Sequence, residues 1–111
     1  MTPHEILVAG RDLLSNPDHW IKKTLARSKN GEKCDPTEAR ATCFCTIGAI
    51  HKVVGSGQKS LKLEVVGYLI KALDERKHRV SAIVVAFNDH PTTKHSDVLE
   101  LWDKAIELAR H

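Results

Sequence analysis

The chain has 111 residues, of which 41% are hydrophobic and 28% are charged, and its formal net charge is +3. This balance is ordinary for a globular protein, and it excludes a collagen-like chain, a long coiled coil and a fully disordered chain. A chain of this length is expected to form a single domain, residues 1–111, with a core that needs no disulfides.

The sequence predicts a cytoplasmic protein with reduced thiols and no membrane contact. Glu5, Arg11 and Asp12 interrupt the apolar pattern of the first residues, so no clean apolar segment of a secretory signal is present. No apolar run approaches the ~18 residues that a membrane span needs. The 3 cysteines are an odd number, which excludes a closed set of disulfides.

The first predicted element is a helix over residues 2–15. Thr2 is a suitable N-cap, Pro3 fits the first turn, and Glu5 stands at the position of a capping box. An apolar stripe follows at helical spacing. Pro17 is expected to end the helix, because the residue before a proline avoids helical backbone angles.

A small β-hairpin is predicted over residues 20–34. Asn30-Gly31 is the sequence most typical of a tight two-residue hairpin turn, in which both residues need positive φ. A short helix from Asp18 to Leu25 is the alternative interpretation of this segment.

The central helix of the core is predicted over residues 36–54. Asp35 is a suitable cap, Pro36 fits the first helical position, and Glu38 places an acidic group in the first turn. Residues 41–50 carry no charge, and a helix that is apolar around most of its circumference is a buried one.

The second half of the chain predicts more helices. One well-buried helix begins near Lys59, and Val80–Phe87 is assigned to a short helix, although its β-branched residues also suit a strand. A polar loop over residues 88–93 follows, with Thr93 as the cap of a last helix over residues 94–109. The expected fold is therefore mainly α with a minor β part: four or five helices around a buried central helix, with one small hairpin.

Cys45 is the candidate nucleophile of a thiol-dependent hydrolase. His95 or His90 would then be the base, and Asn88 or Asp89 the group that orients it. Cys45 lies deep inside the predicted central helix, in an uncharged stretch, and burial there would raise its pKa and make it inert. The hydrolase is therefore the alternative hypothesis.

Four potential zinc ligands are also present: Cys34, Cys43, Cys45 and His51. Structural zinc sites use cysteine pairs two to four residues apart on turns, whereas residues two apart on a helix point in nearly opposite directions. The sequence therefore predicts no metal site and no cofactor.

The loop over residues 88–93 is the candidate contact surface. It gathers Asn88, Asp89 and Thr93 between two apolar segments, which favours the binding of a small-molecule ligand or a partner protein. The same residue types are also typical of Asx turns and helix caps, so a purely structural role is the alternative. The sequence favours a non-enzymatic binding or interaction module.

Nucleic acid is a less favoured partner, because aromatic residues make up only 5% of the chain and the basic residues are scattered. A basic nucleic-acid accessory protein is kept as a second alternative. It would require one basic face formed by Lys22, Lys23, Arg27, Arg76, Lys77 and Arg79.

Two short motifs, Cys45-x-x-Gly48-Ala49 and Phe87-Asn88-Asp89 before a final helix, carry a family resemblance. The chain resembles a family of small uncharacterised bacterial and phage proteins over residues 20–109. The family has no assigned activity, so the resemblance implies only that Asn88 and Asp89 are positions of interest. The chain departs from the family pattern in its basic middle, Lys71 to Arg79, and in its second cysteine, Cys43.

Overall fold

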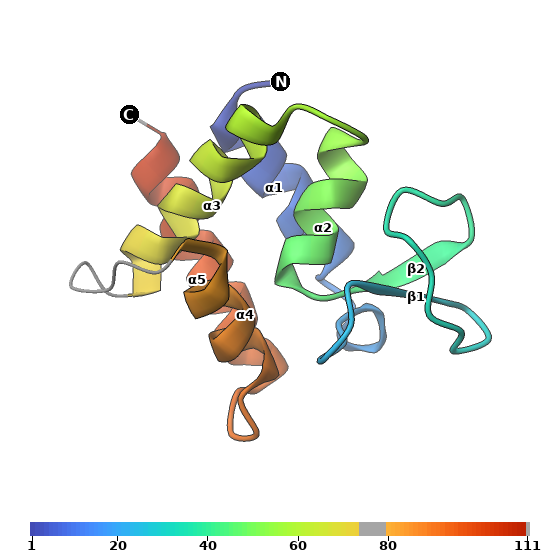
Figure 1. Cartoon of the computed structure of the whole chain (residues 1–111). Helices are drawn as coiled ribbons and strands as arrows, with labels where there is room; N and C mark the ends of the chain where they lie inside the picture. Colours follow the sequence, from blue (N-terminus) through green and yellow to red (C-terminus); the bar gives the residue numbers. More distant parts are fainter. Residues whose placement is uncertain (74–79, 111) are drawn as a thin grey trace.

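The computed structural model describes residues 1–73 and 80–110, without the side chains of residues 80–82. This part of the chain forms five α-helices, one short 3-10 helix and a two-stranded antiparallel sheet. The helices pack together on one side, and the sheet lies on the other, where β2 leads into the start of α2 (Figure 1). The elements are α1 (Pro3–Leu13), η1 (Pro17–His19), β1 (Ala26–Ser28), β2 (Ala41–Phe44), α2 (Thr46–Val54), α3 (Lys59–Leu73), α4 (Val80–Asp89) and α5 (His95–Ala109).

The mainly α fold with a minor β part is confirmed, and so are the helices predicted near both ends of the chain. At the start of α1, Glu5 N donates to Thr2 Oγ1 (3.1 Å) and Thr2 N donates to Glu5 Oε1 (2.8 Å), as a capping box requires. The cap of α5 differs from the prediction: it is Lys94, not Thr93. Lys94 N donates to Asp97 Oδ2 (2.9 Å), so the acidic residue of the first turn closes the helix end.

The predicted helix over residues 36–54 is wrong in its first half, because the helix begins only at Thr46. The cap signal is nevertheless used: Thr37 N donates to Asp35 Oδ1 (2.9 Å), and Asp35 N donates to Glu38 Oε2 (2.6 Å). These bonds stabilise one turn, after which Ala41–Phe44 is extended and pairs with β1. The hydrogen bonds typical of a helix start therefore form here although no helix follows. The pairing of residues 41–44 with β1 overrides their helix propensity.

A turn forms at Asn30-Gly31, but it is not the predicted two-residue turn with positive φ at both positions. Of these two residues only Gly31 has positive φ (+86°), and its N–H donates to Ser28 O (2.9 Å). The returning chain forms only an isolated bridge, between Arg27 and Lys33, and β1 takes β2 as its main partner with Arg27 opposite Cys43. The alternative of a helix from residue 18 to 25 is wrong, because helical turns end at His19.

Residues 80–87 are helical, as predicted, and α4 continues through Asn88 and Asp89. The predicted loop is therefore shorter than residues 88–93 and begins only at His90. This difference matters for the site, because side chains on a helix point in fixed directions about 100° apart along the sequence. Phe87 and Asn88 are adjacent in the sequence but lie on different sides of α4.

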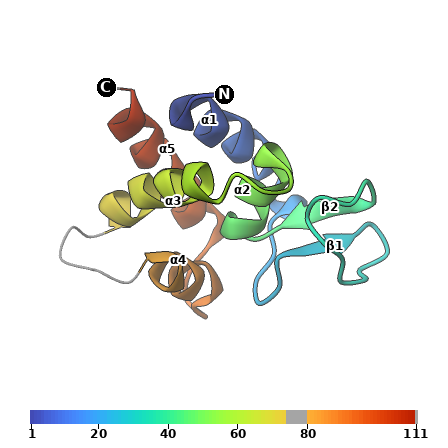
Figure 2. The ribbon, with the colours of Figure 1, turned by 45° about the horizontal axis from the view of Figure 1, so that its top comes forward.

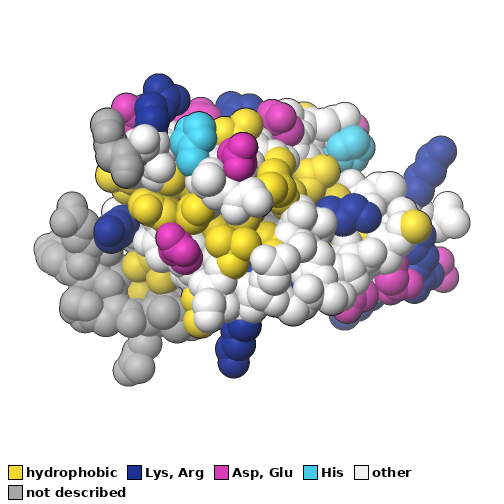
Figure 3. Space-filling view, turned by 90° about the horizontal axis from the view of Figure 1, so that it is seen from above, with side chains coloured by type: hydrophobic (Ala, Val, Ile, Leu, Met, Phe, Trp, Pro, Cys, Tyr) yellow, Lys and Arg dark blue, Asp and Glu magenta, His cyan; other side chains and the backbone are white. Residues whose placement is uncertain are grey.

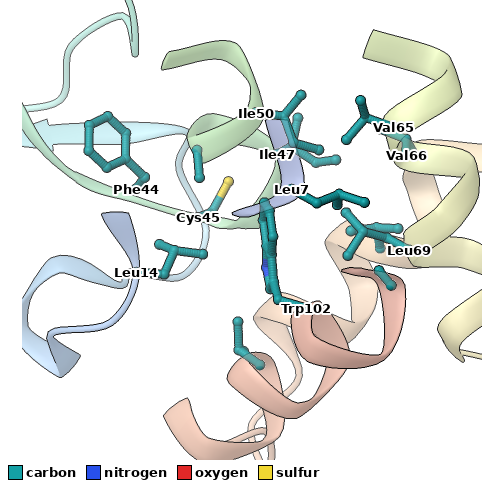
Figure 4. Packing of buried hydrophobic residues seen from close by; sticks show 14 of the residues in the cluster. Leu7, Leu14, Phe44, Cys45, Ile47, Ile50, Val65, Val66, Leu69 and Trp102 are labelled. Atoms are coloured by element: carbon teal, nitrogen blue, oxygen red, sulfur yellow. The ribbon is translucent and has the colours of Figure 1, made fainter. Parts of the chain in front are cut away.

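The core lies between α1, α2, α3 and α5, which surround the fully buried ring of Trp102 (Figure 4). α1 and α5 run side by side in both views of the ribbon (Figures 1 and 2). They approach closely at Gly10, where a Cβ would come within 2.6 Å of the Trp102 ring. Trp102 thus determines the spacing of these two helices.

Candidate functional site

The side chain of Asn88 connects the end of α4 to two distant segments. Asn88 Oδ1 accepts hydrogen bonds from Trp20 Nε1 (2.8 Å), from the backbone N–H of Thr46 (3.0 Å) and from Thr46 Oγ1 (2.8 Å). Asn88 Nδ2 donates to the carbonyl of Ile21 (3.1 Å) and to Asp89 Oδ1 (2.9 Å). We call these five residues the Asn88 cluster. Asn88 is 1% exposed, so its amide binds other parts of the chain and not solvent.

Asp89 and His90 extend this connection to the segment that follows η1. Lys23 N donates to Asp89 Oδ1 (2.8 Å), and Lys22 Nζ donates to the carbonyl of His90 (2.6 Å). Lys23 has φ +71°, a backbone conformation that side chains rarely adopt. The Asp89 carboxylate thus stabilises a strained turn that crosses the end of α4.

Cys45 is the N-cap of α2, not a residue deep inside a helix as predicted. Its Sγ accepts a hydrogen bond from Gly48 N (3.3 Å), and its own N–H donates to the carbonyl of Leu25 (3.2 Å). A Cβ at residue 48 would overlap the Leu25 carbonyl oxygen, so only glycine fits there. Asn88 accepts the N–H of Thr46 and Cys45 accepts the N–H of Gly48, so two N–H groups in the first turn of α2 are hydrogen-bonded.

The surroundings of Cys45 meet only one requirement of a thiol nucleophile: the residue lies at a helix N-terminus, but its side chain is buried. Cys45 is 6% exposed, and burial raises the pKa of its thiol, against the lowering effect of the Gly48 N–H. The two candidate bases bind elsewhere. His95 Nε2 lies 2.6 Å from the carbonyl of Leu14, and His90 Nδ1 lies 2.8 Å from Thr92 Oγ1. The burial of the thiol and the binding of both histidines to other groups therefore weigh against the hydrolase hypothesis.

Two of the four potential zinc ligands weighed and rejected from the sequence, Cys43 and Cys45, bind different parts of the chain. Cys43 lies on β2 and its Sγ contacts the carbonyl of Asp18 (3.4 Å), whereas Cys45 faces the start of α2. Among the residues that the structure describes, no three His, Cys, Asp or Glu side chains form a group that could hold a metal ion.

A groove lies on the opposite side of α4 from the Asn88 cluster. Its main cavity has a volume of about 660 Å³. The lining is apolar along α3 and α4 and polar along the following loop and the start of α5: Leu73, Ile83, Ala86, Phe87, His90, Thr92, Thr93 and Asp97. A second cavity of about 260 Å³ shares Leu73, Phe87 and Asp97 with the first and continues along α5. We call the two cavities together the α4–α5 groove.

The candidate residues from the sequence therefore divide into two sets. Asn88 is buried in the cluster, Asp89 is half-buried beside it, and Thr93 lines the groove. Sequence reasoning missed Leu73, Ile83, Ala86 and Asp97 as groove residues. The signal that could have found Asp97 is its place in the first turn of the last helix, next to the polar loop.

A second hydrophobic region lies on the face where α1 and α3 begin. Hydrophobic side chains reach the surface there between charged ones (Figure 3). The cavity between these elements, lined by Met1, Ile6, Val53, Val54, Gln58 and Leu61, is only about 90 Å³. Ligand sites usually measure about 300–1,000 Å³, so the α4–α5 groove is the better candidate.

The basic face required by the nucleic-acid alternative is only partly within the described residues. Lys22, Lys23 and Arg27 are described, and Lys22 is engaged by Trp20 (5.4 Å from Nζ to the ring centre) as well as by His90. Arg76, Lys77 and Arg79 lie outside the described residues. The alternative therefore stays a prediction.

The comparisons with known proteins agree with a chain of undetermined function. A family model described as a family of unknown function, DUF6197, matches residues 1–108. No curated protein and no solved structure matches the chain. Of the helices described, none has both the length and the apolar character needed to cross a membrane.

Proposed function

The chain belongs to DUF6197, a family of unknown function, and we propose that it is a non-enzymatic binding module. Its ligand is a small molecule that occupies the α4–α5 groove. Of the two partner classes expected from the sequence, a small molecule fits a concave site better than a partner protein does, because protein interfaces are broad and mostly flat.

The observation that carries this proposal is the main cavity of the groove. Its volume of about 660 Å³ falls in the range of ligand sites. Half of the eight described lining residues are apolar, namely Leu73, Ile83, Ala86 and Phe87, and the polar residues lie at one end. An apolar wall with a few polar groups is the usual composition of a site that binds a small molecule and fixes its orientation.

The residues predicted from the sequence have different roles in this proposal. Thr93 contacts the ligand directly from the groove. Asn88 and Asp89 position the loop: their hydrogen bonds to Thr46, Ile21 and Lys23 hold the end of α4 against the rest of the fold. A rigid support of this kind lowers the entropy cost of binding.

A fragment screen tests the proposal. Amide signals of the ¹⁵N-labelled protein are recorded with a library of small apolar fragments, and we expect the largest shifts at Phe87, His90 and Thr93. Ala86→Trp should abolish these shifts, because residue 86 is exposed, helical and part of the lining. Val85→Trp is the matched control: Val85 is its exposed neighbour on α4 but does not line the groove.

A library that shifts no groove signals would contradict the proposal. So would shifts that survive in Ala86→Trp. Both tryptophan variants should keep the dispersed spectrum of the folded protein, because an exposed helical position tolerates a large side chain.

A further inference from the structure

We propose that the ligand of the α4–α5 groove is a small organic cation, an apolar molecule with one ammonium group that Asp97 binds. This inference rests on the proposed function and adds the chemical class of the ligand.

Asp97 is the charged residue that both cavities share. Its Oδ2 accepts the N–H of Lys94 (2.9 Å), which fixes the carboxylate at the start of α5. Within the described part of the chain, no basic side chain forms an ion pair with it. A half-buried carboxylate without such a pair, beside an apolar wall, is complementary to an ammonium group on an apolar body.

His90 also lines the polar end of the main cavity, and its Nδ1 accepts a hydrogen bond from the N–H of Thr92 (3.2 Å). Among the described residues that line the main cavity, Asp97 is the one Asp, Glu, Lys or Arg side chain. The second cavity adds Glu100 and Lys104, whose charges oppose each other.

An anionic ligand is disfavoured by the same arrangement. The N-terminus of a helix carries partial positive charge and generally attracts anions. At α5, however, Asp97 already occupies this position, since it accepts the N–H of the cap residue Lys94. A ligand carboxylate in the main cavity would meet the carboxylate of Asp97, and the lining that the structure describes places no Lys or Arg between the two.

The test uses three probes with the same apolar body: 4-phenylbutylamine, 4-phenylbutanol and 4-phenylbutyrate. Dissociation constants are measured by amide-signal titration of the full chain. We expect the amine to bind about tenfold or more tightly than the alcohol, and the butyrate to bind most weakly. The alcohol measures the contribution of the apolar wall alone.

Asp97→Asn should reduce the preference for the amine over the alcohol to about twofold or less. The substitution removes the charge and retains an oxygen that accepts the Lys94 N–H, so α5 keeps its cap. Glu107→Gln is the matched control, because it removes one negative charge from the same helix at an exposed position outside both cavities. It should leave the preference unchanged.

Failure of this inference is distinguishable from failure of the proposed function. The cation is excluded as the ligand if the alcohol or the butyrate binds as tightly as the amine, if the amine does not bind, or if its preference survives in Asp97→Asn. When the alcohol still binds and Ala86→Trp abolishes that binding, the groove remains a ligand site and only the ligand class is wrong. When neither the probes nor the fragment library shift groove signals, both proposals are wrong.

Discussion

The Asn88 cluster and the α4–α5 groove lie on two sides of one helix end and differ in how their polar groups are used. In the cluster, the amide of Asn88 is 1% exposed and its oxygen and nitrogen both bind other parts of the chain. In the groove, polar side chains border an open cavity of about 660 Å³. A polar residue near a loop can therefore stabilise the fold or bind a ligand, and the direction of its side chain decides which.

The helical geometry of α4 produces this division. Phe87 lines the groove, and Asn88, the next residue, lies in the cluster about 100° further around the helix. The two motifs of the family resemblance meet on the cluster side, where Asn88 binds Thr46 and Cys45 caps the same helix α2. Their proximity assigns a structural role to both motifs.

The largest loss of stability is expected from a substitution near the Asn88 cluster that makes a side chain collide with the backbone. Gly48→Ala should destabilise the fold by at least about 3 kcal/mol, because the added Cβ overlaps the Leu25 carbonyl, which cannot move away as a flexible side chain would. Gly67→Ala is the control, since nothing lies within 4 Å of its added Cβ. It should stabilise the helix by about 0.5–1 kcal/mol. Urea unfolding followed by tryptophan fluorescence measures both, and equal midpoints would contradict the close approach at Gly48.

A smaller effect is expected at the cap of α2. Cys45→Ala should cost about 1 kcal/mol of stability, because it removes the acceptor of the Gly48 N–H. Cys45→Ser should cost less, because the hydroxyl oxygen is a good helix cap. If the serine and alanine variants unfold at the same urea concentration, the thiol is not acting as a cap.

The pH dependence of stability tests whether the thiol of Cys45 is buried and protonated in the folded protein. Burial raises the pKa of the folded Cys45 thiol, so the unfolded chain loses this proton first. The resulting contribution to stability is fully present below the unfolded-state pKa of about 8.5 and is lost as the pH rises through the folded-state pKa. The wild type should therefore lose more stability between pH 7 and pH 10 than Cys45→Ser does. An identical loss in both proteins would contradict a buried, protonated thiol.

The smallest effects on stability are expected in the groove. Thr92→Ala should change the free energy of unfolding by less than about 0.5 kcal/mol, because residue 92 is exposed and belongs to a loop. The same substitution should shift the amide signals of the groove residues, since Thr92 binds the ring of His90. A stability loss as large as that of a cluster variant would show that the groove residues also hold the fold together.

The helices and the turn could be predicted from local patterns, because capping residues, apolar stripes and Asn30-Gly31 act within a few residues. The error over residues 36–45 arose where local and tertiary preferences conflict. Asp35 and Glu38 form the hydrogen bonds of a helix start, yet the chain then pairs with β1, a partner that local sequence does not reveal. The early start of the predicted helix also placed Cys45 wrongly.

The candidate site could be predicted only in part. The composition of residues 88–93 indicated a dense set of hydrogen-bonding groups, but the direction of Asn88 depends on α4 continuing through residue 89. Its partners Trp20 and Thr46 are 68 and 42 residues away in the sequence. The groove itself requires the packing of α3, α4 and α5, which no single segment specifies.

The unfolding free energy of Asn88→Ala, measured beside that of Asp97→Asn, tests the division of roles most directly. Asn88→Ala leaves Trp20 Nε1 and Thr46 N without their acceptor in a buried place, so we expect a loss of about 2–4 kcal/mol. Asp97→Asn keeps its cap oxygen and should lose less than about 1 kcal/mol. If Asn88→Ala is as stable as Asp97→Asn, the Asn88 cluster does not hold the fold together and the division between the two sides of α4 is wrong.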